Sequence, residues 1–463
     1  MIQDVRPVRL QEFRLPRNNA KRSKVEEPLT ELPLDIFSPR LLKMLEEPRN
    51  VEETGIPEEL IANLALKILY FNGTMKAGRI AEAMCLHFSG IVEPVLQNLK
   101  AQHLVQVTGS KDLNRTSFQY AITEKGSMRA RELLDRNRYV GPCPVTLKQY
   151  IEIVRQQSKT RKPVDETQVR TAMNGLVLSK DVIDRIGPAV NSYKSLFLYG
   201  PPGNGKTSIA KAITRHLLPD HIMVPYAIYE DGQIIKVHDA EVHPVMDDEY
   251  SAAIEAAYLD KRWVRCGSPV VISGGELTLA DLDLAWSDTN RFYEAPLQLK
   301  ANNGLLLVDD FGRQQMGPKD LLNRWIVPLE ERIDFLTFHT GKKFAIPFET
   351  LIVFSTNLDP ESLVDEAFLR RIRHKMSIDN PDEQQFYRIF VSACHERKIK
   401  FDKKAFIHLL REYYFSAGRP LKACHPRDIL DQLCDFAAYR NHPPRMTPDM
   451  LDLAARSYFA DLL

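Results

Sequence analysis

The stretch that most constrains the fold is LFLYGPPGNGKTSIAKAI, which begins at Leu196. An apolar run leads into a loop that fits GxxxxGK(S/T), and a helical segment follows the loop. Glycines at this spacing let backbone N–H groups wrap a phosphate chain, and the N-terminus of the following helix favours negative charge. The predicted phosphate contacts come from Gly200, Pro201, Pro202, Gly203, Asn204, Gly205, Lys206, Thr207 and Ser208.

The last residues of this loop predict ATP and Mg²⁺ as ligands. Lys206 would neutralise the β and γ phosphates, and the Thr207 hydroxyl would be a ligand of Mg²⁺. A second apolar run, LLLVDDFG, ends in Asp309 and Asp310. A carboxylate at the end of a buried strand is costly unless positive charge meets it. We therefore expect Asp309 to be the metal ligand and Asp310 to be the carboxylate that activates the attacking water.

Apolar runs alternate with helical segments from about residue 164 to 375. The runs SLFLYG, PVVIS, GLLLVDD and TLIVFSTN are apolar on both faces. Such runs predict a parallel sheet covered by helices on both faces, which is an α/β fold of the P-loop NTPase class. The residues beyond this region have helical patterns only, which predicts an all-helical C-terminal lid.

These motifs together make the region from about Val164 to Leu463 similar to AAA+ ATPases. In FSTNLDP, the resemblance implies that Asn357 is the sensor-1 residue that orients the attacking water, although an Asn capping a turn before Asp-Pro is the alternative. In CHPRDILD, it implies that Arg427 is the sensor-2 residue that reaches the γ-phosphate, although a surface arginine would fit the same pattern.

The segment DEAFLRRIR resembles the region that carries the arginine finger of AAA+ proteins. The resemblance implies that Arg370 or Arg371 projects into the nucleotide site of a neighbouring subunit, and Arg373 is also close. A solvated basic helix end is the alternative. The finger implies a homo-oligomer, with a hexamer as the expected ring.

Alternation around Thr340-Gly341-Lys342-Lys343 predicts a β-hairpin just before sensor 1. Its position resembles the hairpin of one AAA+ branch, which includes MoxR-type chaperones, branch-migration motors and enhancer-binding activators. The resemblance implies that Lys342 and Lys343 contact a substrate in a central pore, or else lie on a plain exposed turn. Phe292 and Tyr293 are candidates for a pore loop or for ordinary core residues.

Residues 56 to 138 resemble a winged helix-turn-helix domain, on the evidence of three helical segments, two alternating strands and YAITEKGSMRARELL. The presumed recognition helix, SGIVEPVLQNLKAQ, carries a single Lys. Phosphate contacts dominate DNA affinity, so docking to a protein is favoured over DNA binding. The expected segments are a basic, Pro-containing arm (1–54), the winged-helix domain (55–140), a linker (141–165), the ATPase core (166–375) and the helical lid (376–463).

Composition adds little about partners, because 62 Lys and Arg balance 61 Asp and Glu. No apolar run approaches the roughly 18 residues of a membrane span, and the polar start does not match a signal peptide, so we expect a cytoplasmic protein.

The favoured function is ATP hydrolysis that remodels an unknown protein client. A DNA-directed ATPase that binds nucleic acid through residues 1–140 and a slow or non-hydrolysing nucleotide-gated scaffold are the alternatives. The AAA+ family usually has Glu where this chain has Asp310, so turnover is expected to be slow.

Overall fold

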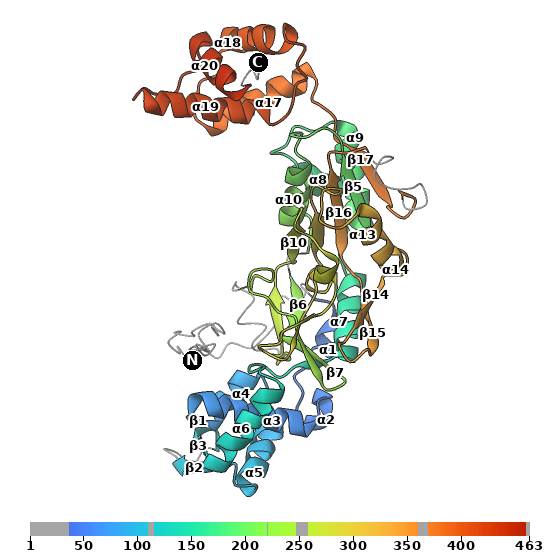
Figure 1. Ribbon diagram of the computed structural model, residues 1–463, viewed down its shortest axis with the longest axis vertical. Coiled ribbons are helices and arrows are strands. Elements are labelled where there is room, and N and C mark those ends of the chain that lie inside the picture. The colour runs from blue at the N-terminus through green and yellow to red at the C-terminus, as the bar shows by residue number, and fades with distance from the viewer. Residues whose placement is uncertain (1–36, 110–114, 220, 247–257, 360–368, 460–463) are drawn as a thin grey trace, which may run out of the picture.

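The computed structural model describes residues 37–109, 115–219, 221–246, 258–359 and 369–459. The chain is elongated, with an N-terminal helical part at one end, a central parallel sheet, and a second helical part at the other end (Figure 1). Most of the predicted basic arm, residues 1–36, lies outside the described residues. No helix among the described residues is long and apolar enough to cross a membrane.

The central sheet has five parallel strands in the order β10-β13-β16-β5-β17. Their bounds are β5 Ser195–Tyr199, β10 Val270–Ser273, β13 Leu305–Val308, β16 Leu351–Thr356 and β17 His374–Ser377. Every residue of β13 and β16 is buried, which explains why these runs are apolar throughout.

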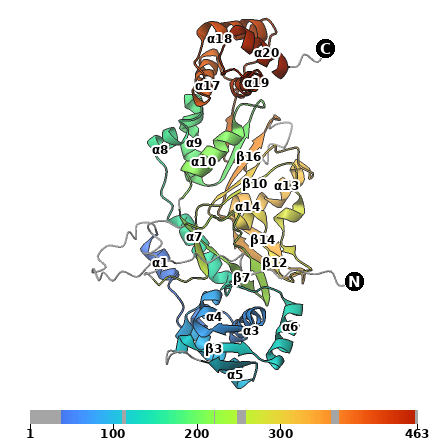
Figure 2. The ribbon, with the colours of Figure 1, turned by 90° about the vertical axis from the view of Figure 1, so that its left-hand side faces the viewer.

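Helices cover both faces of this sheet (Figure 2). Leu196 and Leu198 pack with α8 (Glu166–Ala172), α9 (Lys180–Ser192) and α10 (Lys206–His216), whereas Phe197 packs on the opposite face with α13 (Pro318–Arg324) and α14 (Ile326–Glu331). Successive strand residues point to opposite faces, so one run supplies both cores. The predicted α/β class, with a parallel sheet between helical layers, is confirmed.

A second β region lies between the central sheet and the N-terminal helices (Figure 1). Its five-stranded sheet has the order β11-β12-β8-β7-β4. The strands are β4 Val145–Thr146, β7 Ala227–Glu230, β8 Gln233–Lys236, β11 Ala285–Trp286 and β12 Tyr293–Glu294; a further pair is formed by β6 Ile222–Pro225 and β9 Trp263–Cys266. β7 and β8 form a hairpin that turns at Asp231 and Gly232.

The hairpin predicted around residues 340–343 is also confirmed, as β14 (Ile333–Thr337) and β15 (Lys343–Pro347). It packs into the second β region through Leu336, Phe338, Phe344 and Ile346, which share one apolar cluster with β6 to β9.

The two aromatic pore-loop candidates are buried rather than displayed. Phe292 is 9% exposed and Tyr293 is 1% exposed, so both serve as core residues in this structure.

Residues 145–159 differ from the connecting segment expected over 141–165. They form β4 and α7 (Leu147–Lys159), whose start is a capping box between Thr146 and Gln149. Tyr150, Ile153 and Val154 are buried in the cluster of the second β region. The short amphipathic stretch is therefore a core helix, because its apolar residues recur at helical spacing and meet a sheet far away in the sequence.

The N-terminal part contains the expected helices and paired strands. It consists of α1 (Pro39–Met44), α2 (Val51–Thr54), α3 (Glu58–Asn72), β1 (Thr74–Lys76), α4 (Ala77–Met84), a π-helical turn (Phe88–Val92), α5 (Glu93–Ala101), β2 (Val105–Gly109), β3 (Gln119–Ile122) and α6 (Glu124–Arg136). The strands form an antiparallel sheet in the order β1-β3-β2.

The C-terminal part is helical, as predicted. It consists of α17 (Glu383–Glu396), α18 (Lys403–Leu409), a π-helical segment (Leu410–Phe415), α19 (His425–Tyr439) and α20 (Pro448–Tyr458), packed around a core of their own.

Candidate nucleotide-binding site

The loop between β5 and α10 has a backbone that requires its glycines. Gly200, Gly203 and Gly205 have φ angles of 128°, 84° and 86°, in the region that L side chains rarely adopt. A Cβ atom at Gly200 would lie 2.5 Å from the carbonyl oxygen of Ile378. Gly205 then caps the start of α10, so the loop passes directly into a helix N-terminus.

Lys206 lies inside this loop and is 6% exposed. Its Nζ donates to the carbonyl oxygens of Gly200 at 2.9 Å and Pro201 at 3.0 Å, and to Oδ1 of Asn357 at 2.7 Å. Burial lowers the pKa of Lys206, and the nearby carboxylates of Asp309 and Asp310 oppose that shift. The ammonium is thus held at the mouth of a glycine-rich loop, where phosphate oxygens could replace the carbonyl acceptors.

Two carboxylates face the loop from the end of β13. Oδ2 of Asp309 accepts a hydrogen bond from Oγ1 of Thr207 at 2.9 Å, and Oδ1 of Asp310 accepts one from Nδ2 of Asn357 at 3.1 Å. The carboxyl ends of β5, β13 and β16 therefore bring Lys206, Thr207, both aspartates and Asn357 together. Ligands of open parallel sheets bind at such carboxyl ends, where neighbouring connections diverge.

The loop after β13 is held by Gln314, which our sequence analysis missed. Its Nε2 donates to the carbonyl oxygens of Asp309 at 2.9 Å and Asp310 at 3.2 Å, and its Oε1 accepts from the Gly312 N–H at 2.8 Å. These bonds support Asp310 in a left-handed conformation, with φ of 49°. Asp tolerates this conformation better than most residues do.

Asn204 joins the loop to the C-terminal helices. Its Nδ2 donates to Oδ1 of Asn380 at 2.9 Å, and its Oδ1 accepts from the Ala423 N–H at 3.1 Å. The Cys424 N–H also donates to the carbonyl oxygen of Gly203 at 2.8 Å. The start of α19 therefore rests on the same loop that holds Lys206. Asn380 is a second residue of the site that sequence reasoning missed.

Arg427 is not drawn into this cluster. Its side chain is 65% exposed and pairs with Asp428, its neighbour in α19, at 3.1 Å. Among the described residues, no hydrogen bond or ion pair joins Arg427 to the loop. The arrangement leaves it near the start of α19, three residues after Cys424.

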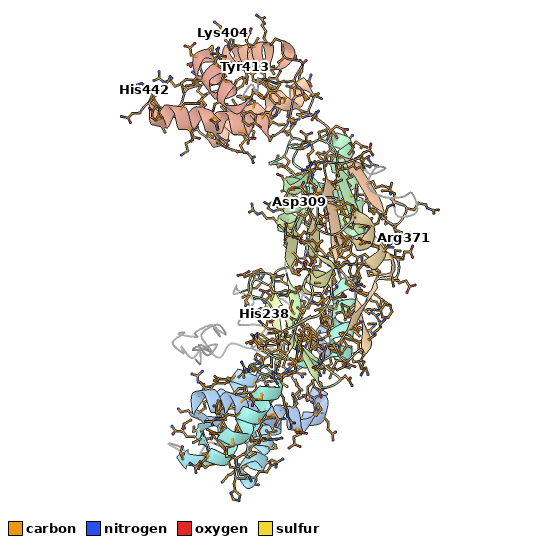
Figure 3. All side chains as sticks on the ribbon, viewed as in Figure 1. His238, Asp309, Arg371, Lys404, Tyr413 and His442 are labelled. Carbon is orange, nitrogen blue, oxygen red and sulfur yellow. The ribbon has the colours of Figure 1, made fainter. Side chains whose placement is uncertain are left out.

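The arginines of the predicted finger lie at the opposite end of the strands from the glycine-rich loop. Arg370, Arg371 and Arg373 precede β17, whose amino end is remote from the carboxyl ends that carry the site. Figure 3 shows Arg371 and Asp309 well apart, and Arg371 pairs with Glu330 at 2.6 Å. Arg370 and Arg373 are exposed. None of the three can serve the site of its own chain in this conformation.

The oxygen donors of the cluster suit a hard divalent cation. The Thr207 hydroxyl and the Asp309 carboxylate offer the kind of oxygen ligands that Mg²⁺ takes alongside substrate phosphates. No group of three or more His, Cys, Asp or Glu residues able to hold a metal ion is found in the described part of the chain. His238 and His243 stack on each other instead, at 5.7 Å between ring centroids.

Comparison with known proteins identifies one matched segment. A model for a domain of unknown function (DUF8689) matches residues 382–457, which span α17 to α20. No curated protein matches the chain.

Two of the similar solved structures are NtrX and RuvB. NtrX from Brucella abortus in complex with ADP is 14% identical, with 71% of this chain and 58% of that chain covered and a TM-score of 0.36. A point mutant of RuvB from Thermotoga maritima is 13% identical, with 68% of this chain and 73% of that chain covered and a TM-score of 0.33. The chain thus spans little more than half the length of NtrX, and likeness at this level identifies neither a family nor an activity.

Proposed function

We propose that this protein is an ATP hydrolase of the AAA+ type that works as an oligomer to remodel a protein partner. The observation that carries the proposal is the convergence of Lys206, Thr207, Asp309, Asp310 and Asn357 at the carboxyl ends of three adjacent parallel strands. In the strand order β10-β13-β16-β5-β17, the connection that leaves β5 runs toward β10, whereas the connection that leaves β16 runs toward β17. The glycine-rich loop after β5 therefore lies where neighbouring connections diverge.

The five side chains divide the chemistry among them. Lys206 and the backbone of the loop bind the phosphates of ATP, and Ser208 follows Thr207 at the start of α10. Thr207 and Asp309 would hold Mg²⁺, which would supply charge neutralisation at the phosphate oxygens. Asp310 accepts a proton from, or orients, the attacking water, and Asn357 fixes the position of that carboxylate through a direct hydrogen bond.

The oligomer is inferred from the place of the arginines before β17. Among the described residues, none of the arginines before β17 reaches the site of its own chain, and the same arginine of a neighbouring copy would supply a positive charge that stabilises the transition state. Arg370 and Arg373 are exposed, whereas Arg371 is engaged with Glu330, so the exposed pair are the better candidates. A hexameric ring in the cytoplasm is the proposed form.

The client is proposed to be a protein that docks on the N-terminal part. We take that part, about residues 55–140, as a winged helix-turn-helix domain, followed by the ATPase core up to 375 and the lid beyond it. Lys100 is the one basic residue of α5 and is exposed, and Glu93, about two turns earlier, pairs with Arg115 at 2.8 Å. The exposed face of α5 has little to offer phosphates, which favours a protein over DNA.

The β14–β15 hairpin is better suited to transmission than to gripping a substrate. Lys342 pairs with Asp231 at 2.9 Å, across the two hairpin turns. The hairpin thereby connects the region after β13 to the sheet that adjoins the N-terminal domain. We propose that ATP hydrolysis shifts the β14–β15 hairpin and, through this contact, that sheet.

Hydrolysis and binding can be separated by Asp310→Asn in the full-length chain. The variant keeps the shape of the side chain but removes its basicity, so phosphate release should fall by roughly a hundredfold or more while binding of a fluorescent ATP analogue persists. Asp320→Asn, at an exposed position of α13, is the matched control and should leave both unchanged. Equal phosphate release from the parent and Asp310→Asn would contradict the proposal.

A further inference from the structure

Positive charge is concentrated in one part of the segment 382–457. The stretches 397–404 and 439–447 contain seven Lys and Arg residues and a single acid, Asp402. The rest of the segment has six basic and nine acidic residues. The seven cations are Arg397, Lys398, Lys400, Lys403, Lys404, Arg440 and Arg445, and we call them, with Tyr439 and His442, the basic tip.

Contacts within the C-terminal core bring the two stretches together. The N–H of Asp402 donates to Sδ of Met446 at 3.4 Å, and Sγ of Cys394 lies 3.8 Å from the same sulfur. The segment before α18 therefore lies against the segment before α20. Lys404, in α18, and His442, between α19 and α20, belong to the C-terminal part and lie well away from Asp309 (Figure 3).

The lysines of the basic tip do not serve helix stability. Lys403 and Lys404 occupy the first turn of α18, which has no acidic residue. The positive end of the helix dipole disfavours cations in a first turn. Lys398 has a left-handed backbone, with φ of 56°, at a position after α17 where Gly or Asn is usual. Both features lower local stability. A ligand that binds the positive charges would explain why lysines occupy these positions.

The charges are free to meet a partner. Lys398, Lys400, Lys403, Lys404 and Arg445 are all exposed. Arg397 is the exception, because its Nε donates to Asp431 at 2.7 Å and anchors the end of α17 on α19. Tyr439, at the end of α19, is 90% exposed, the most exposed large hydrophobic side chain in the described part of the chain.

We propose that the basic tip binds single-stranded nucleic acid. Exposed cations and an exposed aromatic ring in one region are the combination that such ligands use, because phosphates pair with the cations and a base stacks on the ring. The exposed face of α5 lacks this combination, so nucleic acid engages the C-terminal helices and not the N-terminal domain. This binding is independent of ATP hydrolysis and gives the matched segment 382–457 a role.

The test is equilibrium binding of the full-length protein to fluorescein-labelled oligo-dT and oligo-U of about 20 nucleotides. Binding is measured by fluorescence anisotropy in the absence of ATP. Lys403→Gln/Lys404→Gln should weaken binding roughly tenfold and reduce the salt slope by about 0.7 for each phosphate that the variant leaves unneutralised. The matched control is Lys180→Gln/Lys211→Gln, which removes two exposed lysines from the central part, one of them also in the first turn of a helix. The control should bind as the parent does.

Tyr439→Ala separates stacking from charge. It should weaken oligo-dT or oligo-U binding roughly fivefold or more, and a matching duplex should bind more weakly than either single strand. Circular dichroism and phosphate release unchanged from the parent will show that the variants fold.

Three results would overturn the proposal. These are no binding by the parent, equally weakened binding in the two lysine-pair variants, or a duplex bound as tightly as single strands with no effect of Tyr439→Ala. Displacement of the oligonucleotide by polyglutamate at equal charge would instead assign the basic tip to an acidic protein partner.

Discussion

Asn357 donates a hydrogen bond through Nδ2 to Oδ1 of Asp310 at 3.1 Å, while its own Oδ1 accepts from Nζ of Lys206 at 2.7 Å. One amide thus connects the phosphate-binding lysine to the proposed water-activating carboxylate. The chain of contacts links the two groups whose relative placement decides whether bound ATP can be attacked.

Asn357→Ala removes this connection and should lower kcat for ATP hydrolysis by roughly ten- to a hundredfold with little change in KM, because a misplaced catalytic group costs rate more than binding. Steady-state phosphate release measures both constants. Asn98→Ala, on the exposed face of α5, is a suitable control. A rise in KM at constant kcat would mean that Asn357 acts on binding only.

Asp310→Glu should change the hydrolysis rate measurably. The substitution lengthens the side chain by about 1.5 Å, which exceeds the misplacement of about 1 Å that can cost a hundredfold. It also puts Glu at φ of 49°, where Asp is better tolerated. Single-turnover hydrolysis of prebound ATP isolates the effect from product release. A rate identical to that of the parent would show that Asp310 does not touch the water.

Asn204→Ala should loosen the C-terminal helices from the glycine-rich loop. The change removes the acceptor of the half-buried Ala423 N–H and the donor to Oδ1 of the exposed Asn380, and a typical hydrogen bond contributes about 0.5–1.5 kcal/mol. Faster hydrogen exchange around residues 423–425, with unchanged exchange in α20, is the expected signature. Unaltered exchange at both places would contradict the coupling.

Acid should weaken the second β region through His243. Burial lowers the pKa of His243 to about 4. Its Nδ1 accepts from the Asp239 N–H at 3.0 Å, and its Nε2 lies 2.9 Å from the carbonyl oxygen of Lys300, so the neutral ring satisfies both partners. The unfolded state then binds more protons between about pH 6.5 and 4, and stability falls as pH drops through that window.

Thermal denaturation at pH 7 and pH 5 checks this effect. The parent should lose more stability between the two pH values than His243→Asn does. His395→Gln, at an exposed position of α17, should retain the full loss seen in the parent. Equal pH dependence of stability in the parent and His243→Asn would show that His243 does not cause the loss.

Three strands of the central sheet, β5, β13 and β16, were predictable because they are buried on both faces and each leads into polar residues of the site. The runs before Gly200, Asp309 and Asn357 carry that pattern, and the structure brings their ends together. The second β region was only partly predictable. Its short strands, such as β4 and β12, have too few residues to show the alternation of apolar and polar residues that identifies a strand. The helix α7 packs on a sheet whose strands come from residues much later in the chain.

Contacts between residues far apart in the sequence could also not be predicted. Nothing in the sequence around Gln314 indicates that its side chain bonds to the carbonyl of Asp309, because that contact depends on the folded loop after β13. The role of Asn380 likewise depends on its contact with Asn204, which is far away in the sequence. The Arg427 side chain pairs with Asp428 in this conformation, so its expected reach to a phosphate stays a prediction.

The most direct test of the account is phosphate release from Mg²⁺-ATP by the full-length protein, measured beside Lys206→Ala. We predict slow release by the parent that EDTA abolishes and that is roughly a hundredfold lower in Lys206→Ala, because the buried ammonium is lost from the glycine-rich loop. Release by the parent no greater than that by Lys206→Ala would contradict the assignment of this site to ATP hydrolysis.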